Sequence, residues 1–157
     1  MKVLLYPSKL LRQKTLIVKD HKKEEKTINK MKDIMIKSKG IGLAAPQIGL
    51  LKQYFIMEYK DSIIECINPK ILHSSTDLFE YEEGCLSIPG TRHELARPKT
   101  IDVEYETIEG KVIKNTFTDL YSTCFQHEVD HLNGVLFFDH LKIPEKIKFL
   151  TEYAFFA

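Results

Sequence analysis

Two histidines and a glutamate in the C-terminal part of the chain have the spacing of a metal site. His127, Glu128 and His131 form the pattern H-E-x-x-H. Side chains four residues apart on a helix share one face, with Cβ atoms roughly 5–6 Å apart, so both imidazoles can bind one metal ion. The glutamate between them would be placed to transfer protons. A charged surface helix can carry the same letters by coincidence, so this interpretation needs a third ligand.

The residues around the motif leave the third ligand open. Cys124 shares the helical face but lies about 10.5 Å along the helix axis from His131, whereas the ligand atoms of one ion lie within about 4 Å of each other. A metzincin protease needs a histidine three residues after Gly134, and Phe137 stands there. The candidates that remain are Glu145, Glu152, His93, His140 and the soft ligand Cys85, which lies on a glycine-flanked turn.

The composition is that of an ordinary globular domain. The 157 residues are 43% apolar and 29% charged, with a net charge of +1. These values predict a single domain over residues 1–157 without strong attraction to nucleic acid or membrane. Three irregularly spaced cysteines favour a reducing compartment over a disulfide scaffold. The apolar run before Pro7 is too short for a signal peptide, and no run is long enough to span a membrane, so we expect a soluble, cytoplasmic protein.

Hydrophobic periodicity predicts elements that could position these residues. Residues 1–23 are expected to be an extended lead-in, followed by an amphipathic helix over residues 24–39 that ends at Gly40. The small-residue segment 40–49 is expected to be neither helix nor strand. Strands are expected over residues 53–59, 62–67, 100–107 and 111–117. The remaining expectations are a loop at 72–77 that contains His73, a helix that begins near Asp119 and is stopped by Asn133-Gly134, and a final helix over residues 144–153.

Three segments resemble, in order, the signature motifs of the peptide deformylase family. Residues 40–47 read G-I-G-L-A-A-P-Q and match the first motif, G-x-G-L-A-A-x-Q. Residues 83–87 read E-G-C-L-S, the second motif. Residues 126–132 read Q-H-E-V-D-H-L and match the third, Q-H-E-x-D-H-L. The similarity extends from Tyr6-Pro7 to about Leu141, which is nearly the whole chain.

The resemblance implies a fold, an activity and a set of site residues. The fold would be α+β, with mostly antiparallel strands packed around a central helix carrying H-E-x-x-H, an N-terminal amphipathic helix and a short C-terminal helix. The activity would be removal of the formyl group from N-formylmethionine on new polypeptides, with release of formate. By position, the metal ligands would be Cys85, His127 and His131. Glu128 would be the general acid and base, while Gln47 and the backbone N–H of Leu86 would bind the oxyanion.

The resemblance also implies how substrate and metal are bound. Ile41 and Gly42 would pair with the peptide backbone, and Arg92 would contact the substrate. The methionine pocket would be lined by Leu120, Thr123, Cys124 and Tyr81. The family metal is Fe²⁺, although Zn²⁺, Ni²⁺ and Co²⁺ can occupy such sites. The expected partners are N-formyl-methionyl nascent peptides, with contact to the ribosome exit region left open and no specific nucleic acid or membrane.

Some positions leave room for alternatives. Glu83 and Asp130 are candidates to hold the ligating histidines, but Asp130 could equally pair with Arg97. Asp119 stands where many family members have glycine, His93 follows Arg92 where a small residue is common, and the chain ends soon after Pro144. These departures concern pocket shape and substrate range, and the short tail also suits an organellar member or a phage-encoded one that acts in a host cytoplasm. A metalloprotease and a non-catalytic binder of nascent N-termini are the competing functions, and the binder would need neither Glu128 nor Gln47.

Overall fold

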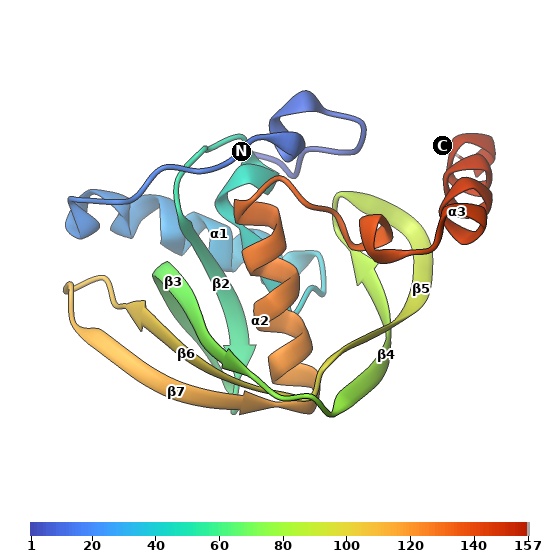
Figure 1. Cartoon of the computed structure of the whole chain (residues 1–157). Helices are drawn as coiled ribbons and strands as arrows, with labels where there is room; N and C mark the ends of the chain where they lie inside the picture. Colours follow the sequence, from blue (N-terminus) through green and yellow to red (C-terminus); the bar gives the residue numbers. More distant parts are fainter. Residues whose placement is uncertain (157) are drawn as a thin grey trace.

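Antiparallel strands surround one buried helix, as Figure 1 shows for the computed structural model, which describes residues 1–156 and the side chains of residues 1–154. This confirms the expected α+β fold. The α-helices are α1 (Glu25–Lys37), α2 (Asp119–Leu132) and α3 (Ile143–Phe156). The strands are β1 (Gly42–Ala44), β2 (Tyr54–Tyr59), β3 (Ser62–Ser74), β4 (Leu78–Cys85), β5 (Ile88–Pro98), β6 (Thr100–Glu106) and β7 (Val112–Thr118). Four short 3₁₀ helices are η1 (Lys9–Arg12), η2 (His21–Glu24), η3 (Ala45–Ile48) and η4 (Phe137–His140).

The strands form two sheets that are both packed against α2. The larger sheet has the order β1-β2-β3-β6-β7, and β4 pairs with β5 in the smaller one; all pairings are antiparallel. Alternate residues of a strand point to opposite sides of the sheet. Strand β2 is buried on both faces because α2 covers one side and α1 the other. Phe55 packs edge-on against Phe125 of α2, with ring centroids 5.0 Å apart. Tyr54 and Ile56 face the opposite way, into the core formed with α1.

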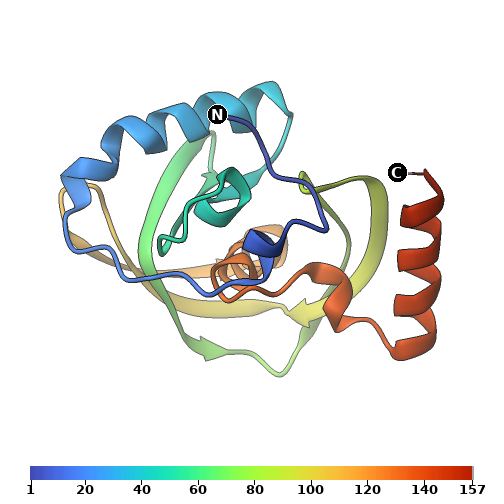
Figure 2. The same cartoon turned by 90° about the horizontal axis from the view of Figure 1, so that it is seen from above.

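Helix α1 covers the outer face of the larger sheet, as Figure 2 shows from above. Its buried residues Ile28, Met31 and Met35 have the predicted spacing and confirm an amphipathic helix there. The helix ends two residues earlier than expected, and Lys39 rather than Gly40 takes the left-handed conformation, with φ 55°. The N–H groups of Lys39 and Gly40 donate to the carbonyls of Ile36 and Met35, so a lysine occupies the usual glycine position of this C-terminal motif.

An apolar cluster beside η4 joins the N-terminal segment to α3. Tyr6 contacts Phe138 and Tyr153, with ring centroids 5.2 and 5.8 Å apart. The Tyr153 hydroxyl donates to the Tyr6 carbonyl at 3.1 Å, and Phe149 stacks on Phe138. The final helix is therefore held to the N-terminal segment, and it is four residues longer than the predicted 144–153. None of the helices within residues 1–156 is long and apolar enough to cross a membrane.

Several predicted strand and loop positions are wrong. Strand β3 continues to Ser74, so His73 lies in a strand, and its last five residues are exposed and carry no apolar alternation. The segment 40–49 contains the short strand β1 as well as η3. The hairpin of β4 and β5 has no counterpart in the predicted elements. Its buried face includes the charged residues Glu83 and Arg97, so hydrophobic periodicity could not reveal it.

Candidate active site

Helix α2 directs the H-E-x-x-H residues into the interior between the two sheets. Thr118, in extended conformation, precedes the helix, which begins at Asp119 and runs to Leu132. His127, Glu128 and His131 are all buried, and the two imidazole centroids lie 5.0 Å apart. Phe125 and Leu132 of the same helix lie in the apolar core, so packing against the sheets fixes α2 and thereby positions its buried polar residues.

Cys85, the last residue of β4, provides the third ligand atom of a cluster with His127 and His131. Its Sγ lies 3.3 Å from Nε2 of His131. The thiol and the two imidazoles each place one ligand atom within 4.8 Å of the other two. Across the described part of the chain, this is the only group of three or more such side chains close enough to hold one ion. The other candidates for a third ligand lie outside the group: Cys124, Glu145, Glu152, His93 and His140.

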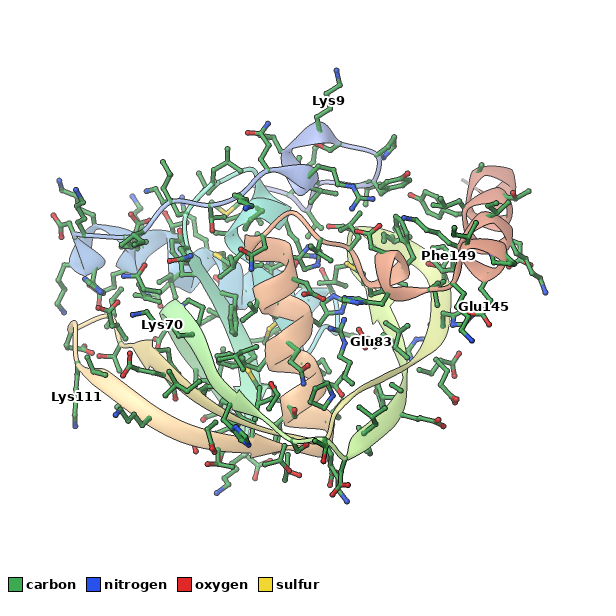
Figure 3. The ribbon with its side chains drawn as sticks, in the orientation of Figure 1. Lys9, Lys70, Glu83, Lys111, Glu145 and Phe149 are labelled. Carbon is green, nitrogen blue, oxygen red and sulfur yellow. The ribbon has the colours of Figure 1, made fainter. Side chains whose placement is uncertain are left out.

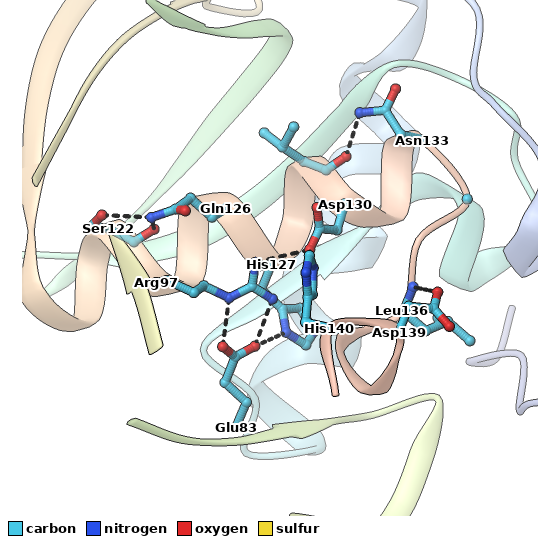
Figure 4. Close-up of polar contacts among 12 residues, drawn as sticks. Glu83, Arg97, Ser122, Gln126, His127, Asp130, Asn133, Leu136, Asp139 and His140 are labelled. Carbon is cyan, nitrogen blue, oxygen red and sulfur yellow. Dashed lines mark hydrogen bonds and ion pairs between the residues drawn. The ribbon is translucent and has the colours of Figure 1, made fainter. Parts of the chain in front are cut away.

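A chain of charged groups fixes the orientation of His127, as Figure 4 shows. Nδ1 of His127 lies 2.9 Å from Oε1 of Glu83, which also binds Arg97 through both carboxylate oxygens. Arg97 in turn donates to Asp130 at 2.9 Å, and His140 contacts the same Asp130 oxygen at 2.8 Å. Glu83 therefore holds a histidine, as considered above, whereas Asp130 pairs with Arg97. Burial opposes the charge on Glu83, but the contacts with His127 and Arg97 outweigh it and lower the pKa of Glu83.

The donor set fits a divalent metal ion of intermediate softness. Glu83 occupies Nδ1 of His127, which leaves Nε2 as the ligand atom. The 3.3 Å between Sγ of Cys85 and Nε2 of His131 is an edge length expected for two ligands with metal bonds of about 2.0–2.3 Å. Burial lowers the pKa of His131, which keeps this imidazole in the neutral, ligating form. Two imidazoles and one thiolate suit iron, zinc, nickel or cobalt better than magnesium or calcium.

Glu128 lies in a confined space, and its carboxyl group has two features of a proton-transfer group. Its Oε2 is buried and has no hydrogen-bond partner among the described residues. Burial is the main cause that raises the pKa of Glu128 to about 7, assisted by the neighbouring carboxylates of Glu83 and Asp130. A carboxyl group with this pKa can exchange a proton near neutral pH. Gly42 packs directly against its carboxylate, where a Cβ atom would lie 2.6 Å from Oε1.

Gln47 is held so that its amide group points toward Cys85. Its Oε1 accepts from the N–H of Ala44 at 2.9 Å, which assigns the NH₂ group to the opposite side. That NH₂ group lies 3.1 Å from Oγ of Ser87 and 3.6 Å from Sγ of Cys85. Ser87, fully buried, is a positioning residue that the sequence interpretation missed, although it lies within the E-G-C-L-S motif.

One cavity of about 580 Å³ joins these groups to the surface. This volume is within the range of ligand-binding pockets in proteins. Twelve of the thirteen predicted site residues line it, and His131 is buried outside its wall. The twelve are Ile41, Gly42, Gln47, Tyr81, Cys85, Leu86, Arg92, Leu120, Thr123, Cys124, His127 and Glu128. Ser38 and Lys39 also line the cavity and were not predicted; they follow α1, where the sequence carries no catalytic motif.

Comparisons with known proteins show which family and which solved structures this chain is similar to. A family model described as polypeptide deformylase matches residues 1–146, which include every residue of the cluster and the cavity. The chain is 40% identical over 156 residues to the peptide deformylase of Borreliella burgdorferi, which covers 98% of this chain and 94% of that protein. A crystal structure of a peptide deformylase from Legionella pneumophila has a TM-score of 0.92 at 34% identity, covering 99% and 94% of the two chains. The enzyme from Thermus thermophilus has a TM-score of 0.91 at 38% identity, covering 96% and 90%.

Proposed function

The chain belongs to the polypeptide deformylase family, and we propose on that premise that Cys85, His127 and His131 bind one catalytic metal ion within a single domain of residues 1–157. Members of this family are metal-dependent hydrolases that remove the N-formyl group from nascent polypeptides, and this is the activity of the chain. What we propose is the identity of the ion and the role of each residue. The 4.8 Å cluster of one thiol and two imidazoles is the observation that carries it.

The ion in this proposal is Fe²⁺, with Zn²⁺, Ni²⁺ and Co²⁺ as substitutes. When bound by three protein ligands, a divalent ion lowers the pKa of water at its remaining position and polarises a carbonyl oxygen. Glu83 supports this arrangement because its contact with Nδ1 of His127 fixes the ring and the tautomer.

Glu128 acts first as a base and then as an acid. It accepts a proton from the water that attacks the formyl carbon, which requires the ionised carboxylate. It then delivers that proton to the departing amine nitrogen as the C–N bond breaks, so the products are formate and a free N-terminus. The pKa of about 7 suits both steps, since neither protonation state is strongly disfavoured near neutral pH. The absence of a hydrogen-bond partner for Oε2 among the described residues leaves that oxygen available for the transferred proton.

Gln47 and the backbone N–H of Leu86 stabilise the negative oxygen that develops during attack. The contact of the Gln47 carbonyl with Ala44 fixes its NH₂ group toward Cys85, so little reorganisation is needed during the reaction. Loss of one such donor typically costs about 10²–10³ in rate.

The substrate backbone pairs with the free edge of β1. The carbonyl of Ile41 accepts from the N–H of Glu58 at 2.8 Å and thus points toward β2. Neighbouring residues of a strand direct their polar groups to opposite sides, so the N–H and C=O of Gly42 face away from β2 and can bind a peptide. Arg92 contacts the peptide farther out, and the methionine side chain occupies the space lined by Tyr81, Leu120, Thr123 and Cys124. The enzyme meets N-formyl-methionyl chains in the cytoplasm, at the exit region of the ribosome.

Formate release from formyl-Met-Ala-Ser tests the proposal. Protein reconstituted anaerobically with Fe²⁺ should release formate, and the metal-free protein should not. Absence of turnover in the iron form, combined with cleavage of internal peptide bonds, would instead support a metalloprotease. Binding of the formylated peptide without turnover would support a non-catalytic binder.

A further inference from the structure

Two cations line the exposed part of the active-site cavity. Lys39 follows α1 and Arg92 lies on β5, and both side chains are exposed residues of the cavity wall. Neither makes an ion pair with any described residue. Isolated cations are ordinary on a protein surface, but two that line one cavity place their charge where a ligand enters it.

The acidic side chains of the cavity lie deeper than these cations. Among the described residues that line it, Glu83 and Glu128 are the acidic ones, and both are buried. Figure 3 shows Glu83 in the interior, between α2 and β4. Its carboxylate is already engaged by Arg97 and His127. The exposed part of the cavity wall therefore carries positive charge without an acidic side chain to neutralise it.

The position of Arg92 depends on Gly84. The two residues are paired across the hairpin of β4 and β5. A Cβ atom on Gly84 would lie 3.2 Å from Nε and 3.4 Å from Cγ of Arg92, so the arginine side chain lies across the glycine. Glu82 and Glu94 are two residues away along the same hairpin, but neither forms an ion pair with Arg92 or lines the cavity. The guanidinium group is therefore available to a ligand in the cavity.

The end of α1 fixes the backbone of Lys39 at the edge of the same cavity. Its φ is 55°, and the N–H groups of Lys39 and Gly40 donate to the carbonyls of Ile36 and Met35 at 3.1 and 3.0 Å. Gly40 packs under Leu86, since a Cβ atom there would lie 2.9 Å from Cδ1 of Leu86. Glycine is the usual residue in this conformation, so backbone preference does not account for the lysine.

The proposed path of the substrate leads past both cations. In the proposed function the peptide backbone pairs with the edge of β1 at Gly42, which lies against the buried Glu128. The residues before Gly42 lead from this buried point to the exposed Lys39. Three residues of extended chain span about 10 Å, so a substrate that runs outward along this edge reaches Lys39 within about two to three residues after its methionine.

We propose that Lys39 and Arg92 form an anion-selective subsite, which favours formyl-methionyl chains with aspartate or glutamate directly after the methionine. The proposal rests on the proposed function, because that function supplies the peptide and its direction. A terminal carboxylate offers the same chemistry, but the C-terminus of a growing chain is far from its formylated end. Exposed ion pairs typically change affinity by about 1.4- to 5-fold each, so two cations predict a preference of about three- to tenfold.

Two amidated peptides of matched shape test the subsite. Formyl-Met-Asp-Asp-amide and formyl-Met-Asn-Asn-amide differ in side-chain charge, and the amide removes the terminal carboxylate. The measured quantity is the ratio of their kcat/KM values for formate release. A ratio is needed because Arg92 contacts the peptide, so its loss can change every rate.

The ratio should be about three to ten in the metal-loaded wild type and about one in K39Q/R92Q. K37Q/K99Q is the control of equal charge, since both lysines are exposed and neither lines the cavity; it should keep the wild-type ratio. The wild-type ratio should also fall toward one in 1 M salt, where the Debye length is about 3 Å.

Several outcomes would overturn the subsite while leaving deformylation intact. One is a wild-type ratio near one with formate released from both peptides. Another is an equal fall of the ratio in both double variants, which would attribute the preference to total charge. A third is a preference for formyl-Met-Ala-Ser over its amide without a preference for the aspartate peptide, which would assign the cations to a terminal carboxylate.

A binding measurement separates this proposal from the proposed function. Isothermal titration calorimetry of the two amides with metal-loaded Glu128→Ala needs no turnover, and the Kd values should differ by the same three- to tenfold, about the effect of two exposed ion pairs. Equal Kd values would overturn the subsite. Release of formate from neither peptide, with the difference in Kd intact, would refute the proposed function alone.

Discussion

The backbone of Gly42 lies against the carboxylate of Glu128. A Cβ atom added to Gly42 would lie 2.6 Å from Oε1 of Glu128 and 3.0 Å from Sγ of Cys124. The contact with Glu128 is closer than real Cβ atoms show, the contact with Cys124 is unusually tight, and Glu128 is held in a buried position. Gly42, which we propose binds the substrate backbone, and Glu128, which we propose transfers protons, therefore share one space.

Gly42→Ala should reduce deformylation by displacing Glu128. We expect a loss of about 10²-fold or more in kcat/KM, since a misplaced general base loses much of its effect. Glu128→Ala should lose nearly all activity while keeping its metal, because the three ligands remain. Metal content and formate release measured together would show this. The control is Gly40→Ala, where the new Cβ meets the flexible end of Leu86 at 2.9 Å, so a near-normal rate is expected. Equal losses in the two glycine variants would contradict the assignment.

Glu83→Gln should weaken metal binding without touching a ligand. The substitution removes the charge that orients His127 and leaves Arg97 with Asp130 as its remaining acidic partner. Losses of about 10–100-fold in metal affinity are typical for such positions. Metal transfer to a chromogenic chelator measures the change. Glu94→Gln, an exposed site on β5, is the matched control and should behave as wild type. An unchanged chelation rate in the Glu83 variant would contradict this role.

The iron form should lose activity in air, and the zinc form should not. Fe²⁺ can be oxidised whereas Zn²⁺ has no accessible redox chemistry, so the comparison separates oxidation of the metal from oxidation of Cys85. Half-lives of formate release in air and under nitrogen provide the measurement. Equal decay of both metal forms in air would identify Cys85 as the sensitive group. Equal half-lives of the iron form with and without oxygen would contradict the prediction.

Sequence patterns revealed the parts of the site whose geometry is local. The i and i+4 spacing of His127 and His131 required only a helix, and α2 has the expected bounds. Cys124 could be rejected from helix dimensions alone, and it lies outside the cluster. Cys85 and Gln47 differ because nothing in their local spacing relates them to α2. Cys85 was one of five candidates until its motif singled it out, and the motif alone indicated Gln47, since the contacts arise from tertiary packing of β4 and η3.

The sequence named Glu83 and Arg97 but revealed neither the hairpin of β4 and β5 nor their pairing within it, because both depend on buried charge. Glu83 and Arg97 lie on the inner face of the hairpin formed by β4 and β5, where periodicity would require apolar residues. Their pairing compensates for burial, and no one-dimensional pattern expresses a contact between residues 14 positions apart.

Acid should weaken the link between the N-terminal segment and η4 through Asp139. Burial opposes its charge, but Arg12, the N–H of Leu136 and Lys146 outweigh burial and lower its pKa below the ordinary 3.8. A carboxyl group whose pKa is lowered in the folded state stabilises the protein above the unfolded pKa, and this stability disappears as pH falls through the folded value. Urea unfolding of wild type and Asp139→Asn should therefore differ near neutral pH, and the difference should shrink as the pH falls below the ordinary pKa of 3.8 toward the lowered folded value. A difference that persists undiminished in acid would exclude this carboxylate as the cause.

Gly134→Ala should be among the most destabilising single-methyl changes in this protein. Gly134 has φ 73°, and a Cβ there would lie 2.4 Å from the carbonyl oxygen of Arg12 and 2.6 Å from its carbonyl carbon. Backbone atoms cannot rotate away as a side chain can, so α2 and the N-terminal segment would have to separate. Gly110→Ala is the matched control, because its φ is 80° and nothing lies within 4 Å of the added atom. The control should lose only the cost of the left-handed conformation, about 1–2 kcal/mol, whereas Gly134→Ala should lose clearly more. Since α2 carries both histidines, Gly134→Ala should also release metal at a lower urea concentration than Gly110→Ala; equal unfolding midpoints would show that Arg12 yields easily at this contact.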